Sequence, residues 1–221
     1  MRALEGKEKA LGVEHTSTLD TVSNLGLLYA GRGKLDEAEK MYMRALEGYE
    51  KALGAEHTST LNTVNYLGML YADRGKLDEA EKMCMRALEG YEKALGAEHT
   101  STLNTVNNWG TLYADRGKLD EAEKMCMRAL EGYEKAIGPE NIPTFTPALN
   151  TMWNLAFLFN RQDKVKDART LYLKALSGYQ KVVGDDHPKC QALRNNLAAL
   201  GKEGATSRKH KILKMLGLKW T

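Results

Sequence analysis

The sequence predicts an all-α protein built as a solenoid of antiparallel helical hairpins, and three observations support this. His15, His57 and His99 stand 42 residues apart inside near-identical segments, and a fixed period of roughly 20 to 50 residues is typical of repeat arrays. Within each period, apolar residues recur at helical spacing. Glycines separate the two helical segments in the first three full periods, as they commonly do at helix ends. Because one such unit cannot cover its own apolar face, neighbouring units are expected to stack.

The first helix of a repeat is predicted in the segment "HTSTLDTVSNLGLLYA", where apolar residues recur from Leu19 to Tyr29. We expect a hydroxyl group within Thr16–Thr18 to cap its amino terminus by accepting a free backbone N–H. The segment Gly31–Gly33 is expected to end the helix, because glycine adopts the left-handed conformation without a steric penalty.

The second helix is predicted in "KLDEAEKMYMRALEGYEKAL", which ends before Gly54. Asp36 and Glu37 lie in its first turn, where the helix dipole favours negative charge. An apolar stripe from Leu35 to Leu53 faces the first helix. The small residue at Gly26 is expected where the two helices cross closely.

This reading divides the chain into an array over residues 1–200 and a basic tail over residues 201–221. Residues 1–12 copy the second half of a repeat, so we expect the sequence to be part of a longer protein. The fourth repeat carries a four-residue insertion near "IPTFTPAL". The array comprises a partial repeat at 1–12, full repeats at about 13–54, 55–96, 97–138 and 139–184, and a partial repeat at 185–200.

The repeat resembles the tetratricopeptide repeat. The residues that carry the resemblance in the first full unit are Val22, Leu25, Gly26, Tyr29, Ala38, Tyr42 and Ala45. The 42-residue period, with "RGKLDEAEKMYMRAL" and "VVGDDHP", resembles the kinesin-light-chain branch. Repeats this alike also resemble the C-terminal sensor arrays of fungal NOD-like receptors. The resemblance implies a right-handed superhelix whose first helices line a concave groove that binds proteins or peptides.

Differences between the repeats gather on one stripe of the first helix. Of seven differences between residues 13–52 and 55–94, five fall at positions 2, 5, 6, 9 and 13 of that helix, counted from Leu19. These positions share one helical face, distinct from the Leu/Gly/Tyr core face. We call this set the recognition stripe. Its members, by position, are Asp20, Asn62, Asn104 and Asn150; Ser23, Asn65, Asn107, Trp153 and Asn195; Asn24, Tyr66, Asn108, Asn154 and Asn196; Leu27, Met69, Thr111 and Phe157; and Asp73, Asp115 and Arg161, with Gly31 in the first repeat.

The chemistry of the recognition stripe suits an extended peptide. An Asn amide both donates and accepts hydrogen bonds, so a column of them can hold a peptide backbone. Large apolar members such as Tyr66 and Phe157 would supply anchoring pockets. The alternative is drift on an exposed surface, but the exposed face of the second helix barely differs between repeats. The Lys/Arg clamp that chaperone-binding members use for a terminal carboxylate is absent from these positions.

Other chemistry is not expected in this segment. The net charge of +3 implies no nucleic acid partner for the array. Histidines one repeat apart stand too far from one another to share a zinc ion. Cys84 and Cys126 fall on the aromatic core position and are expected to be small buried fillers. "GRGK" is a turn between helices rather than a phosphate loop. We therefore predict no enzyme activity, metal or cofactor.

The tail contains a basic amphipathic segment, "TSRKHKILKMLGLKW", with two interpretations. It is either a capping helix that covers the last repeat or a contact for an anionic membrane or an acidic partner. The sequence contains no signal peptide or long apolar run, and its three cysteines make no disulfide framework, which fits a cytoplasmic protein. Two biological roles stay open: the recognition array of a receptor, or a cargo adaptor. A nucleotide-binding loop upstream would favour the receptor, and a heptad coiled coil would favour the adaptor.

Overall fold

The structure is a computed structural model that describes residues 2–200. All regular structure in these residues is helical, which confirms the all-α prediction. The tail at 201–221, with its predicted capping helix, lies outside the described residues. No helix between residues 2 and 200 is both long and apolar enough to cross a bilayer. The helices are α1 (Arg2–Leu11), α2 (Thr16–Gly31), α3 (Leu35–Leu53), α4 (Thr58–Asp73), α5 (Leu77–Leu95), α6 (Thr100–Asp115), α7 (Leu119–Ile137), the 3₁₀ helix η1 (Ile142–Thr144), α8 (Thr146–Arg161), α9 (Val165–Val183) and α10 (Pro188–Ala199).

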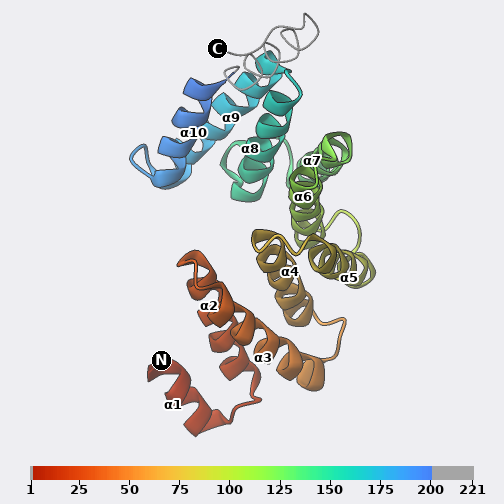
Figure 1. Ribbon diagram of the computed structural model, residues 1–221, viewed down its shortest axis with the longest axis vertical. Helices are drawn as coiled ribbons and strands as arrows, with labels where there is room; N and C mark the ends of the chain where they lie inside the picture. Colours follow the sequence, from red (N-terminus) through yellow and green to blue (C-terminus); the bar gives the residue numbers. More distant parts are fainter. Residues whose placement is uncertain (1, 201–221) are drawn as a thin grey trace, which may run out of the picture. The chain divides into compact units, whose positions relative to one another are not determined.

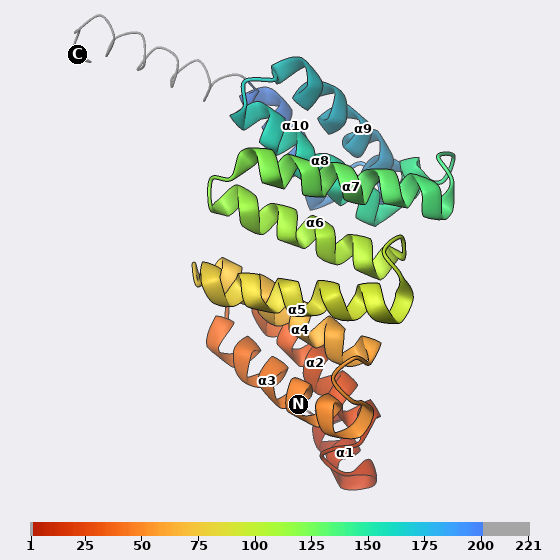
Figure 2. The same cartoon turned by 90° about the vertical axis from the view of Figure 1, so that its right-hand side faces the viewer.

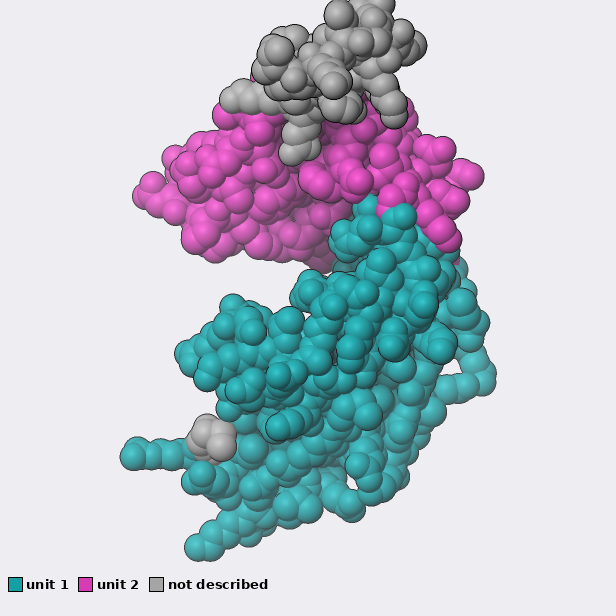
Figure 3. All heavy atoms as spheres, viewed as in Figure 1, with its two compact units in different colours: residues 1–116 teal, residues 117–221 magenta. Residues whose placement is uncertain are grey.

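The chain forms two compact units, one up to residue 116 and one from residue 117 onward (Figure 3). In the first unit, α2 packs against α3 and α4 against α5; in the second, α8 packs against α9 (Figure 1). Each second helix also contacts the first helix that follows it within its unit: α3 contacts α4, α5 contacts α6, α7 contacts α8, and α9 contacts α10. The predicted hairpins are therefore present in these three pairs, and each hairpin stacks on a neighbour.

A glycine closes the turn inside each hairpin of the first unit. Gly33 has φ +71°, and the N–H of Lys34 donates to the carbonyl of Tyr29 at 2.9 Å, so the last turn of α2 is capped. Asp163 holds the corresponding place between α8 and α9, with φ 62°. Asp is among the few residues with a side chain that tolerate this region.

The repeated segment "GAEHTSTL" forms the turn between successive hairpins. Gly54 has φ +91°, and its carbonyl accepts a hydrogen bond from the Thr60 hydroxyl at 2.8 Å. His57 is the N-cap of α4, because its Nδ1 accepts the N–H of Ser59 at 3.2 Å. The expectation that a hydroxyl group within Thr16–Thr18 caps the helix is wrong, because His15 caps it instead. The capping residues are His15, His57, His99 and His187.

The turn before α8 departs from this pattern. The four-residue insertion lengthens the connection between α7 and α8 (Figure 2), which contains η1. Phe145 precedes α8 in place of the histidine and makes no side-chain cap, while Ala148 replaces the buried threonine. The fourth repeat therefore joins its predecessor through a differently built connection.

Two close helix crossings are occupied by glycine in the first two full repeats. A Cβ at Gly26 would lie 2.6 Å from the Tyr42 ring, and one at Gly68 would lie 3.2 Å from the sulfur of Cys84. The predicted close crossing at this position is therefore confirmed. The sequence analysis missed a second crossing on the other helix, where a Cβ at Gly90 would lie 2.4 Å from Leu61.

The histidine cap predicts a measurable cost. Replacing His57→Ala removes the acceptor of the Ser59 N–H, and loss of an N-cap typically lowers the free energy of unfolding by about 1 kcal/mol. The matched variant His57→Asn keeps a capping acceptor and should stay within a few tenths of the parent, on the order of the spread among good caps. Urea unfolding followed by circular dichroism checks both. Equal stability of the two variants would show that the cap contributes nothing.

The first crossing predicts a contrast between two glycines. Gly26→Ala forces a methyl group into the ring of Tyr42, which is buried and stacks on Tyr66 at 5.6 Å, so the ring has little room to move. We expect a net loss of about 1–2 kcal/mol in the free energy of unfolding, after the better helix propensity of Ala is counted. Gly68→Ala meets only the sulfur of Cys84 and the Cβ of Met83 and should cost less than about 1 kcal/mol or stabilise. The reverse order in thermal unfolding would contradict this packing.

Candidate functional site

In the first unit, stacking brings the recognition stripes of successive repeats next to one another. There α2 contacts α4, and α4 contacts α6, so the stripes of three repeats lie side by side. Leu27 and Met69 expose 40 % and 46 % of their surface although both are large apolar residues. Apolar side chains left in water on a polar stripe are the kind of group that a partner can cover. The other exposed members in this unit are Asp20, Asn24, Asn62, Asp73, Thr111 and Asp115; Asn104 is half-buried.

Five members of the stripe line one hollow of about 330 Å³ between α2 and α4. Its walls carry carboxylate, hydroxyl and amide groups, and they leave polar atoms open to a ligand. Such a lining matches a polypeptide backbone, which offers N–H donors and C=O acceptors in alternation. The lining residues are Asp20, Ser23 and Asn24 of α2 and Asn62 and Tyr66 of α4, together with Tyr49 and Ser59.

The next pair of first helices is joined by an amide. Nδ2 of Asn108 donates to Oδ1 of Asn65 at 3.3 Å and lies 3.5 Å from the sulfur of Met69. Two predicted positions of α4 thus meet one of α6, so this part of the stripe is a continuous surface.

Position 2 of the stripe is tied to the second helix of its own hairpin. The hydroxyl of Tyr49 donates to Oδ1 of Asp20 at 2.5 Å, and that of Tyr91 donates to Oδ1 of Asn62 at 2.6 Å. Burial, reinforced by the bond to Asp20, raises the pKa of Tyr49, so the hydroxyl keeps its proton at neutral pH. The sequence analysis included this part of α3 in an apolar stripe and did not predict these hydrogen bonds. A tyrosine hydroxyl therefore occupies one side-chain oxygen at position 2. The NH₂ group of Asn62 stays available to a ligand.

Position 5 is less accessible than the rest of the stripe. Ser23, Asn65 and Asn107 each expose only 8 % of their surface. Ser23 still reaches the hollow, and Asn65 is held by Asn108. In the second unit, Trp153 is half-buried and Asn195 is exposed, with its Oδ1 accepting from Gln191 Nε2 at 3.2 Å.

The stripe of the second unit has a lysine beside it. Nζ of Lys189, from α10, donates to Oδ1 of Asn150 at 3.3 Å and lies 4.8 Å from the centre of the Tyr179 ring. The same Asn150 oxygen accepts the Tyr179 hydroxyl, and Trp153 meets that ring edge to face. Burial lowers the pKa of Lys189. Sequence reasoning missed Lys189 because it lies outside the variable positions.

The remaining stripe members of the second unit form a smaller patch. Phe157 is exposed, and the guanidinium of Arg161 lies 5.8 Å from the centre of its ring, within reach of a cation–π contact. Asn154 and Asn196 are half-buried.

Metal and thiol chemistry finds little support in the described part of the chain. Between residues 2 and 200, no three His, Cys, Asp or Glu side chains gather as ligands of an ion would. The repeated histidines act as helix caps instead. Cys84 and Cys126 are buried core residues, as predicted. Cys190 replaces the buried threonine of the inter-repeat turn, and its sulfur lies 3.3 Å from the carbonyl of Gly184.

Comparisons with known proteins agree with this architecture. A tetratricopeptide repeat model matches residues 1–51, 17–93 and 57–135, and a second tetratricopeptide repeat model matches residues 149–189. Because these matches span most of the sequence, the chain belongs to the tetratricopeptide repeat family. A search of curated proteins found no match.

Solved structures show the same fold at low sequence identity. The crystal structure of BtubC (BKLC) from P. vanneervenii has a TM-score of 0.70 at 19% identity, covering 100% of this chain and 89% of that one. A second match is a Podosopora anserina protein with nearly identical TPR-like repeats, provisionally designated a kinesin light chain. It has a TM-score of 0.65 at 21% identity, covering 91% of this chain and 93% of that one. The chain is therefore similar to kinesin-light-chain-like arrays in fold.

The buried cysteines predict slow thiol chemistry. Burial raises the pKa of Cys84 to about 11 and that of Cys126 to about 12, so almost no thiolate exists at pH 7. We expect labelling by a maleimide to be at least about a hundredfold slower in the folded chain than in denaturant, because only the exposed thiolate reacts. Mass spectrometry of labelled peptides measures each site. Rapid labelling of Cys126 in the folded chain would contradict its burial.

Proposed function

We propose that this chain is a protein-binding module that holds an extended segment of a partner along the recognition stripe. One observation carries the proposal: five stripe residues from two successive repeats line a single polar hollow. These are positions of one helical face at which the repeats differ in sequence. Their convergence supports a role in recognition.

The chemistry of the hollow supports a peptide ligand. Asp20 and Asn24 offer acceptors from α2, and the Asn62 amide, whose oxygen is already bound by Tyr91, offers donors from α4. Leu27 and Met69 are exposed on the same stripe. A backbone held by amides, with side chains resting on exposed apolar residues, is a common way to recognise an extended segment.

One pair of differences has a packing explanation instead. Tyr66 stacks on Tyr42 of the preceding repeat at 5.6 Å. In the next repeat, the equivalent residues are Cys84 and Asn108. There Cys84 packs with Leu112 and Trp109 instead. Tyr66→Asn alone would therefore leave the Tyr42 ring without its partner. Recognition is therefore tested best at stripe positions with no role in the core.

For the biological role, we propose the recognition array of a larger cytoplasmic signalling protein of the NOD-like receptor type, without enzyme activity in this segment. The alternative is a cargo adaptor. The fold likeness to a protein designated a kinesin light chain favours that branch of the family but not either role. The two are distinguished by the domains encoded alongside the array.

A charge placed in the hollow should abolish binding through the stripe. Asn24 is exposed and lines the hollow, so Asn24→Lys adds bulk and charge without disturbing the core and should shift the free energy of unfolding by less than about 0.5 kcal/mol. Ala52→Lys, on the exposed side of α3, is the matched control with the same charge change. Immobilised chains are incubated with cell lysate, and captured proteins are quantified by mass spectrometry.

We expect the parent chain and Ala52→Lys to capture the partners of the stripe in similar amounts. Asn24→Lys should lower the captured amount of these proteins by at least about tenfold. If no captured protein distinguishes the two variants, the stripe is not the binding surface.

A further inference from the structure

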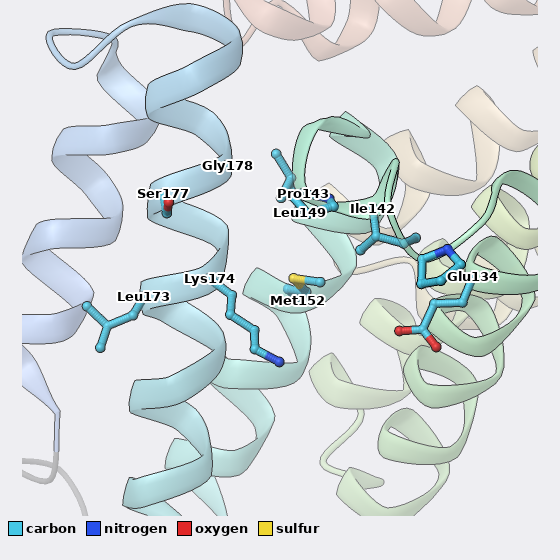
Figure 4. Close-up of a pocket in the computed structure, with 10 residues that line it drawn as sticks. Glu134, Ile142, Pro143, Leu149, Met152, Leu173, Lys174, Ser177 and Gly178 are labelled. Carbon is cyan, nitrogen blue, oxygen red and sulfur yellow. The ribbon is translucent and has the colours of Figure 1, made fainter.

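We propose a second binding site, separate from the recognition stripe, in an apolar pocket of about 490 Å³ in the second unit (Figure 4). It takes one large apolar side chain of a partner polypeptide, Leu, Met or Phe, flanked by one acidic and one basic residue. The pocket lies among α7, η1, α8 and α9, and its size is in the range of ligand sites, about 300–1,000 Å³.

The pocket arises where the repeat pattern is broken. Elsewhere an ion pair links successive second helices: Arg86 of α5 binds Glu50 of α3, and Arg44 of α3 binds Glu8 of α1 at 2.5 Å. The corresponding residues of α7 and α9 are Glu134 and Lys174. These two make no ion pair between residues 2 and 200, and both line the pocket instead. Figure 4 shows both side chains reaching into the space between α7 and α9.

The insertion opens this space. In the other junctions a capping histidine holds the turn, together with a buried threonine or, before α10, Cys190. Here η1 enters against α9 instead. A Cβ at Gly178 would lie 2.6 Å from the carbonyl oxygen of Pro143, so the glycine is required for η1 to come this close. The insertion thus occupies the region where α7 and α9 would otherwise be linked through their side chains.

The floor of the pocket is apolar and its edge is charged. Ile142, Leu149 and Met152 form the floor and are at most 6 % exposed, whereas Leu173 at the edge is half exposed. An apolar side chain seated on this floor would be removed from water, which favours binding of Leu, Met or Phe.

The charged edge determines what may flank that side chain. A partner that covers the pocket also removes Glu134 and Lys174 from part of their water, which is costly unless each meets an opposite charge. An acidic residue beside Lys174 and a basic residue beside Glu134 satisfy both groups. This requirement distinguishes the site from a merely exposed apolar patch.

The site is also distinct from the stripe on the same helix. Leu149 and Met152 project from one face of α8, while the stripe residues Asn150, Trp153 and Phe157 lie on another. Binding at one site leaves the other open, so the two proposals stand or fall independently.

Three fluorescent 12-residue peptides with a central Leu test the site on the full chain: one with a Glu on one side and a Lys on the other, one with Glu on both sides, and one with Lys on both sides. Fluorescence anisotropy measures each dissociation constant. The parent chain should prefer the mixed peptide. Lys174→Glu should shift the preference by at least about tenfold toward the peptide with two Lys, and Glu134→Lys toward the peptide with two Glu.

Two variants serve as controls. Arg86→Glu makes the same change at the equivalent position of the second repeat and should leave the preference of the chain unchanged. Ser177→Trp fills the pocket from an exposed position and should abolish binding of all three peptides. Circular dichroism confirms that each variant is folded. The proposal is overturned if the parent chain binds none of the peptides, if Lys174→Glu leaves the preference unchanged, or if Arg86→Glu shifts it equally.

Discussion

The structure depends on one constraint: no hairpin buries its apolar face alone. The largest side chains of one repeat are covered by the next, so that Tyr42 and Leu46 of α3, Leu61 and Leu67 of α4, and Tyr91 of α5 belong to one core cluster. Stacking therefore fixes where each first helix lies relative to the previous one within a unit. Stacking leaves most members of the recognition stripe exposed or half-buried, whereas it covers position 5 in the first unit.

Three residues of the repeated segment build the turn between successive hairpins. Gly54, His57 and Thr60 each satisfy a different need of the inter-repeat turn: a positive φ, a helix cap and a buried hydrogen bond. Where the histidine and threonine are replaced by Phe145 and Ala148 and residues are inserted, the ion pair between second helices is lost and a pocket appears.

The binding surface and the hairpin share residues. Tyrosine hydroxyls from the second helices hold position 2 of the stripe, so part of each candidate binding residue is already committed to the fold. This arrangement orients the side chains before a ligand arrives, which reduces the entropy lost on binding. It also means that substitutions at Asp20 or Asn62 affect stability as well as recognition, whereas Asn24 is free of such a role.

The sequence by itself determined the helices, the hairpin turns, the close crossing at Gly26 and the buried cysteines. These follow from periodicity and from local backbone chemistry, which neighbouring residues decide. The histidine caps are local as well, since each histidine accepts the N–H of the residue two places further on, but the sequence analysis missed them. Only the tertiary structure decided that Asn65 is buried, that Tyr91 bonds Asn62, and that Glu134 stands apart from Lys174. A helical period tells which residues share a face, but the partner of each polar atom depends on how closely segments far apart in the sequence approach one another.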